Sequence, residues 1–224
     1  MTLILKSGTA LKSPKYPAKL GVESLPVAGY SDRWNAEPLA SGASVSNLPN
    51  TVQGPWGAFI QTDPAQQPTV VTEGGFKHIA NTATSQLVMP PFTTTGPKTM
   101  VVIGKVLTGD GAVLVGANGA NWNIGVTSTK FFMNAGLTIL GPNKDTAWHV
   151  FIAVFNGAAS VFSVDGVEYA GDAGTNQPTN LRMFSSGGGI YATGGVRDVA
   201  IYPGAMSQVD RQKLTAQLKD KYSL

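Results

Sequence analysis

The stretch WHVFIAVFNGAASVFSVDGVEYAG, residues 148–171, has almost no charge and reads as three β-strands joined by two tight turns. Residues 148–155 are apolar on both alternating faces, apart from His149. A strand with one solvated face would alternate apolar and polar residues, so this strand is predicted to be covered on both sides. Asn156-Gly157 and Asp165-Gly166 can supply the positive φ angles that tight hairpins need. The stretch therefore predicts two consecutive hairpins inside a packed β-domain.

Short strands bounded by Gly, Asn or Pro also precede this stretch. They are predicted over residues 99–107, 112–117, 122–127, 130–134 and 137–140. Regular short strands with turn signals between them are typical of an antiparallel sandwich or barrel. The 224 residues, of which 42% are hydrophobic and 13% charged, suit one such β-domain.

The C-terminal segment predicts one α-helix. Ser207 can cap its start, with Asp210 three positions on. Leu214, Leu218 and Tyr222 recur at helical spacing and are predicted to pack on the sandwich. The basic side chains are expected to be solvated: Arg211, Lys213, Lys219 and Lys221.

Basic charge is concentrated at the N-terminus. Residues 1–22 contain Lys6, Lys12, Lys15 and Lys19 and no acid, whereas the rest of the chain has 12 basic and 13 acidic residues. We therefore divide the chain into a basic arm, residues 1–25, and a domain, residues 26–224, whose first part up to residue 75 is expected to be irregular. The arm is either a solvated tail or a strap that docks on a neighbouring subunit. A nucleic-acid partner is not expected, because basic and aromatic residues do not share a folded face.

Several segments resemble a known family. TAWHVFIAVFNGAASVFSVDGVEYAG and GGVRDVAIYPGAMSQVDRQKLTAQLKDKYSL resemble concanavalin A-like jelly-roll domains of the laminin-G type. SDRWNAEPLASGASVSNLPNTVQG and DPAQQPTVVTEGGFKHI resemble the entry segment of such domains in bacteriophage virion proteins and bacterial surface proteins. The resemblance covers roughly residues 30–224 and rests on the order of the motifs. It implies an all-β, two-sheet antiparallel jelly-roll sandwich with an N-terminal arm and one C-terminal helix.

The family's fold hosts lectins, glycosidases and scaffolds, so function must be tested on the residues. A glycosidase needs two carboxylates about 5–9 Å apart, and the E-x-D-x-x-E spacing of laminarinase-type enzymes is absent. Asp165 and Glu168 form a close pair, as do Glu168 and Asp172, but Asp165 lies in a predicted turn. His78 and His149 share no short motif with a carboxylate. No catalytic residue is assigned, and we expect a non-enzyme.

Cofactor and metal motifs are weak. GGGIYA, residues 187–192, formally satisfies G-x-G-x-x-A, but strand signals lie on both sides of it, where a dinucleotide site needs a following helix. We therefore assign it to a glycine turn, and no cofactor is expected. Loop residues that could converge on calcium are Asp110, Asn118, Asn121, Asn143, Asp145 and Asp172. None forms a D-x-D-x-D run, and Asp and Asn are ordinary turn residues, so no metal site is assigned.

One patch is a candidate for carbohydrate. Asn121, Trp122 and Asn123 would give an aromatic plate between two amides at the edge of a loop. A Trp at a strand start is otherwise a core residue.

Three function classes remain. The preferred one is a non-enzymatic virion structural protein of a bacteriophage, a capsid decoration, collar or tail component present in several copies and attached to other virion proteins through residues 1–25. It would be made in the host cytoplasm, without membrane insertion, because the N-terminus lacks a signal-peptide layout. The alternatives are a glycan-binding adhesin module, with a host surface glycan as partner, and a glycan hydrolase.

Overall fold

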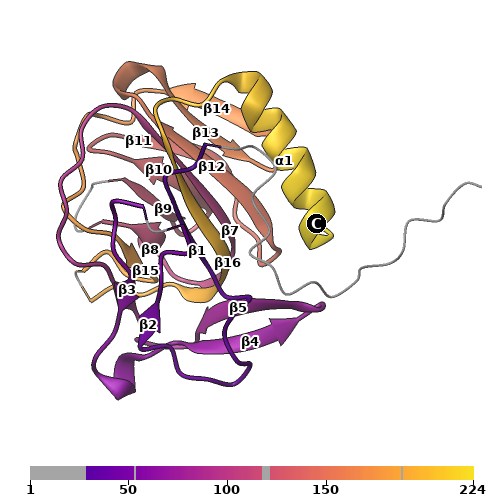
Figure 1. Ribbon diagram of the computed structural model, residues 1–224. Coiled ribbons are helices and arrows are strands. Elements are labelled where there is room, and N and C mark those ends of the chain that lie inside the picture. The colour runs from indigo at the N-terminus through magenta and orange to yellow at the C-terminus, as the bar shows by residue number, and fades with distance from the viewer. Residues whose placement is uncertain (1–28, 53, 118–121, 188) are drawn as a thin grey trace, which may run out of the picture.

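The computed structural model describes residues 29–224 apart from residues 53, 118–121 and 188. Two antiparallel β-sheets pack face to face, and one helix, α1 (Gln208–Tyr222), lies along the outer face of one sheet (Figure 1). This confirms the predicted two-sheet sandwich with a C-terminal helix. Within the described residues, α1 is not apolar enough to cross a membrane. Residues 1–28, which include the predicted arm, lie outside the described residues.

The first sheet, sheet A, carries the quoted stretch. Its strand order is β14 (Val167–Gly171), β13 (Ser160–Val164), β12 (His149–Phe155), β7 (Lys98–Thr108), β16 (Thr193–Pro203), β5 (Phe76–Asn81) and β4 (Thr69–Glu73). A further strand, β1 (Asp32–Asn35), pairs with the C-terminal part of β16.

The second sheet, sheet B, is made mostly of shorter strands. Its order is β11 (Thr138–Asn143), β10 (Lys130–Asn134), β9 (Asn123–Val126), β8 (Ala112–Gly116), β15 (Arg182–Met183), β6 (Leu87–Val88), β3 (Phe59–Ile60) and β2 (Asn47–Leu48). Two 3₁₀ helices, η1 (Pro64–Gln66) and η2 (Gly157–Ala159), lie in connections.

Strand β12 is buried on both faces, as predicted. Phe151, Ala153 and Phe155 point into the core between the sheets. Val150 and Ile152 point the other way, into a second core under α1. The neighbouring strands β7 and β16 divide their side chains in the same way. These three strands, β7, β12 and β16, therefore carry apolar side chains on both faces, because one face packs on sheet B and the other packs on α1.

Helix α1 docks through the predicted stripe. Leu214, Leu218 and Tyr222 are buried, and the Ser207 hydroxyl accepts a hydrogen bond from the Asp210 amide at 3.2 Å, which confirms the cap. The expectation for Arg211 was wrong. Its guanidinium is buried and donates to both carboxylate oxygens of a β14 residue, Glu168, at 2.9 Å each. A bidentate ion pair of this kind fixes the helix to the edge of sheet A.

Two further expectations need correction. The segment 26–75 was expected to be irregular, but it contains strands β1, β2, β3 and β4. Asn156-Gly157 was expected to close a tight hairpin, but the chain makes the 3₁₀ helix η2 there, with Asn156 at φ −149°. The second turn is as predicted, since Asp165 and Gly166 have φ angles of 53° and 90°.

A buried polar network joins the first strand, the last strand and the helix. The Arg33 guanidinium on β1 donates to the Asp198 carboxylate on β16, with a shortest contact of 2.6 Å, and the Tyr222 hydroxyl donates to the same carboxylate at 2.9 Å. Burial opposes the charge on Arg33, but Asp198 outweighs it and the pKa of Arg33 is raised. Burial and Asp198 together raise the pKa of Tyr222 well above its ordinary value. The network is therefore locked as a charged pair with a neutral phenol.

Candidate functional site

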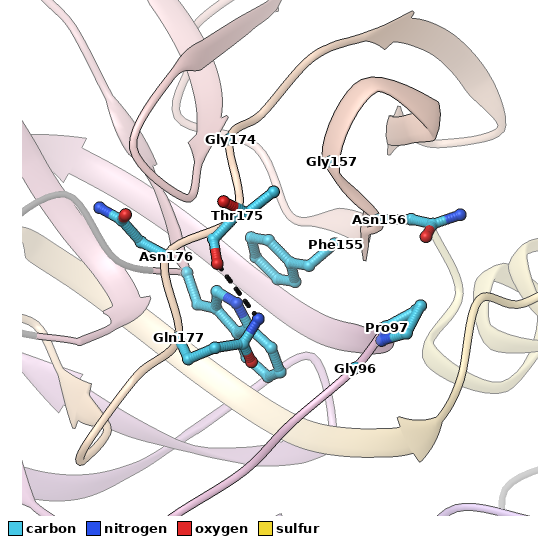
Figure 2. Close-up of a pocket in the computed structure, with 10 residues that line it drawn as sticks. Gly96, Pro97, Phe155, Asn156, Gly157, Gly174, Thr175, Asn176 and Gln177 are labelled. Carbon is cyan, nitrogen blue, oxygen red and sulfur yellow. Dashed lines mark hydrogen bonds between the residues drawn. The ribbon is translucent and has the colours of Figure 1, made fainter.

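A pocket of about 230 Å³ lies at one end of the sandwich. Phe155 ends β12 and pairs with Lys98, the first residue of β7, so the segments just beyond both strands meet there. The described residues that line the pocket come from the last residue of β12 and from connections between strands: Gly96, Pro97, Trp122, Phe155, Asn156, Gly157, Gly174, Thr175, Asn176 and Gln177. Figure 2 shows Phe155 near the centre, with Asn156 and Asn176 on opposite sides of it.

Two stacked rings form the apolar part of the pocket. Trp122, which precedes β9, lies parallel to Phe155 with ring centroids 4.9 Å apart and planes at 6°. Both side chains are almost fully buried, at 1% and 3% exposed. The Trp122 backbone is left-handed, with φ 48°, which costs energy for a side chain of this size. Its indole N–H is buried from solvent and, among the described residues, has no hydrogen-bond partner.

The polar part of the pocket is made of amides and a hydroxyl. Thr175, Asn176 and Gln177 are exposed in the loop after β14, and Asn156 is half-buried at the start of η2. Gln177 Nε2 donates to the Thr175 carbonyl at 3.3 Å (Figure 2). Among the described residues, the Asn156 and Asn176 side-chain amides have no hydrogen-bond partner. These groups can both donate to and accept from hydroxyl groups of a ligand.

The backbone fixes the loop that carries these amides. The backbone N–H of Asn176 donates to the Ala135 carbonyl at 2.9 Å, and the backbone N–H of Gly174 donates to Asp172 Oδ1 at 2.8 Å. Gly174 has φ 86°, and a Cβ atom there would overlap the Ala135 carbonyl oxygen. Only glycine suits this position, because it has a left-handed backbone and no room for a side chain. The polar wall is thus anchored to the end of β10.

The predicted carbohydrate patch is not assembled as expected. Trp122 does line the pocket, but it is stacked into the core and does not stand out from a loop. Asn123 is buried on β9, and its Oδ1 accepts from the Ala117 amide at 2.9 Å. Asn121 lies outside the described residues. The sequence analysis missed Asn156 and residues 174–177 as pocket residues. Asn156 had been assigned to a turn, and residues 174–177 belong to no motif.

The candidate acids of sheet A are engaged elsewhere. Asp165 contacts His149, while Glu168 contacts Arg211, so the two carboxylates turn to different partners. Asp172 bonds its own loop backbone. Among the described residues, no group of three or more His, Asp or Glu side chains is placed to hold a metal ion. GGGIYA runs directly into strand β16 at Thr193, so no helix follows the glycines.

His149 lies between two carboxylates. Its Nδ1 is 2.7 Å from Asp165 Oδ2, and its Nε2 is 2.8 Å from Asp145 Oδ1. Burial disfavours the charged ring, but the two hydrogen bonds outweigh it and raise the pKa of His149. Burial likewise opposes the charge on Asp145 and Asp165, and hydrogen bonds lower the pKa of both. Each ring nitrogen of His149 thus contacts an ionised carboxylate, and these two contacts fix the start of β12.

His78 on β5 is in the opposite situation. It is 3% exposed, its Nδ1 has no hydrogen-bond partner in the part of the chain that the structure describes, and Lys105 and Arg197 lie near it. Burial, followed by the charge of Lys105, lowers the pKa of His78 to about 4, although Glu73 acts against this. His78 is therefore neutral in the folded protein near neutral pH, whereas the pKa of His149 is raised above its ordinary value.

We expect these two histidines to give a stability maximum near pH 6.5. The unfolded chain protonates His78 below 6.5 whereas the folded chain does so only near 4, so stability falls as pH drops through that window, by roughly 3 kcal/mol. The contribution of His149 is fully present below 6.5 and is lost as pH rises through its raised folded-state pKa. Urea denaturation over this pH range measures both limbs.

Variants separate the two limbs. His78→Gln should flatten the acid limb above about pH 4, and His149→Gln should flatten the alkaline limb. Unchanged slopes in both variants would contradict the assignment of these limbs to the histidines.

Comparisons with known proteins identify the fold alone. No protein-family model matches the chain, and no curated protein sequence matches it. The Trypanosoma rangeli sialidase structure has a TM-score of 0.63 at 14% identity, over 93% of this chain and 35% of that one. Domain 4 of AbnA, an extracellular GH43 arabinanase from Geobacillus stearothermophilus in complex with arabinotriose, has a TM-score of 0.61 at 13% identity, over 84% of this chain and 98% of that one.

A third similar structure is the binding domain of Paraclostridial Mosquitocidal Protein 1, with a TM-score of 0.60 at 10% identity, over 84% of this chain and 52% of that one. This chain spans about a third of the length of the sialidases. The similar structures are thus sandwich domains of glycan-processing enzymes and of binding proteins.

Proposed function

We propose that this chain is a non-enzymatic glycan-binding module and that its ligand enters the pocket at the end of the sandwich. The observation that carries the proposal is the group of amides at the rim of the pocket: among the described residues, the side chains of Asn156 and Asn176 have no hydrogen-bond partner, and the buried rings of Trp122 and Phe155 form the apolar floor beneath them. A sugar carries many hydroxyls, which match side-chain amides that both donate and accept hydrogen bonds. The arabinanase domain in complex with arabinotriose, which has a similar fold, supports this reading.

The size of the pocket supports recognition of a single sugar residue. Pockets that enclose drug-sized ligands measure about 300–1,000 Å³, and this one is smaller at about 230 Å³. One ring of a longer chain would enter, while its neighbours lie over the exposed loop of residues 175–177.

The absence of catalysis is part of the proposal. Asp165 and Glu168 are bound to His149 and Arg211, and neither lines the pocket. The pocket's described lining has no ionisable side chain, so it offers no group for general acid or base work.

Removing the pocket amides should weaken glycan binding without unfolding the protein. Asn156→Ala and Gln177→Ala each delete a group that can contribute about 0.5–1.5 kcal/mol, equivalent to a roughly 2–10-fold loss of affinity. A glycan array identifies the ligand, and calorimetric titration measures the change. Gln208→Ala, an exposed amide at the start of α1, is the matched control and should bind as the parent does. Unaltered affinity in both pocket variants would place the ligand elsewhere.

The virion role is a second proposal, and it rests on sequence. The lysines of residues 1–22 contrast with a nearly neutral remainder, which favours an arm that joins an acidic partner surface. A glycan-binding module carried on a phage particle would unite both proposals. Incorporation of residues 26–224 into the particle at the level of the full chain would contradict the arm's role.

A further inference from the structure

The pocket's charge composition bears on which glycans it takes. Acidic sugars such as sialic and uronic acids carry a carboxylate, which proteins recognise with Arg or Lys, most strongly through a bidentate guanidinium. Calcium-dependent sugar sites need several oxygen ligands, usually with carboxylates among them. Neutral sugars need neither a basic side chain nor a metal ion.

No described lining residue is ionisable. The polar groups are the side chains of Asn156, Thr175, Asn176 and Gln177. A buried carboxylate without a charged partner would be strongly disfavoured at such a lining.

The charged residues next to the pocket in sequence are already bound to backbone groups. Lys98 follows Pro97, and its ammonium donates to the carbonyls of Thr95 at 2.6 Å and Pro97 at 3.3 Å. Asp172 accepts from the Gly174 amide at 2.8 Å. Both therefore stabilise their own loops.

The arginines of the chain are committed elsewhere. Arg33 pairs with Asp198, and Arg211 pairs with Glu168. Arg182 donates to Gln86 at 3.0 Å, and the Arg197 guanidinium lies 4.0 Å from the Trp148 ring centroid. None of the four lines the pocket. The backbone amides of Gly174 and Asn176 are likewise occupied.

Resting on the proposed function, we propose that the pocket selects neutral saccharides, discriminates against sialylated and uronic-acid sugars, and binds without a metal ion. Selection arises because a carboxylate entering the pocket loses water and meets amides and rings in place of a cation. Sugar hydroxyl groups lose little hydrogen bonding on entering the pocket, because the Asn, Gln and Thr side chains replace the water molecules that they give up.

The experiment is a titration of the full chain with matched saccharides. Binding is measured by calorimetry or NMR, once without EDTA and once in its presence. The pairs are galactotriose against trigalacturonate and lactose against sialyllactose, within a wider array of neutral and acidic glycans. We expect a neutral ligand to bind at least about tenfold more tightly than its acidic counterpart, with no change on adding EDTA. Equal or tighter binding of the acidic member, or loss of binding in EDTA, would overturn the selectivity while leaving the proposed function in place.

A charge-gain variant tests the same point independently. Gln177→Arg places a guanidinium at the exposed mouth of the pocket and should raise affinity for the acidic member of each pair. Gln208→Arg adds the same charge on α1, away from the pocket, and should not. An equal gain in both variants would attribute the effect to net charge and overturn the inference. If no glycan on the array binds, the proposed function fails, and the inference fails with it.

Discussion

Replacing Asp198 with alanine is expected to destabilise the folded domain by about 3–5 kcal/mol, the usual cost of removing one partner of a buried ion pair. The Arg33 guanidinium and Asp198 carboxylate are 3% and 1% exposed, so the arginine would lose its carboxylate in a site that water does not reach. Tyr222 would lose the acceptor of its hydroxyl in the same change. Denaturation by urea, monitored by tryptophan fluorescence, measures the loss.

The matched control is Asp110→Ala, which removes a carboxylate from an exposed turn. Surface changes of this kind stay within about 0.5 kcal/mol. The double variant Arg33→Met, Asp198→Leu removes both charges together and should recover much of the stability, as apolar replacement of buried pairs often does. An Asp198→Ala protein as stable as the control would show that the network contributes nothing.

Trp122→Ala is expected to cost about 3–5 kcal/mol, because it empties a large buried volume beside Phe155. For a domain of this size, that is a fall in melting temperature of roughly 6–20 °C. The sequence alone allowed the opposite result, a Trp plate whose loss would weaken glycan binding and leave the melting temperature unchanged. Thermal denaturation distinguishes these cases directly.

Trp122→Phe is the companion variant. It keeps a ring stacked on Phe155 and should preserve more stability than alanine, but it removes the unpartnered indole N–H. A near-parental melting temperature for Trp122→Ala would contradict the core assignment.

The fold could be predicted because its signal is a local pattern. Residues 150–155 are apolar at every position, and the two covers that this requires are sheet B and α1. The Ser207 cap and the stripe through Leu214 and Leu218 placed the helix within a residue of its start. These features depend on neighbours in sequence or on one face of one element.

The site could not be predicted in the same way, because it depends on distant contacts. The loop of residues 174–177 lies beside Asn156 through the Asn176 backbone amide, which donates to the Ala135 carbonyl 41 positions earlier at 2.9 Å. Arg211 has the helical position of a solvated cation, and only the arrangement of β14 brings Glu168 to it. Nothing in the spacing of residues 122, 155 and 176 shows that they meet.

The Arg33–Asp198–Tyr222 network also constrains the order in which the parts of the protein can fold during synthesis. Its central pair joins residues 165 positions apart in sequence, and β1 pairs with β16, which is among the last segments made. Contacts of such long range slow folding, because the loop between them must close before they stabilise anything. During synthesis, Trp34 and the apolar faces of β7 and β12 therefore emerge well before β16 and α1 can cover them. The nascent chain therefore exposes apolar surface through this interval, which favours aggregation until the last strand and the helix are made.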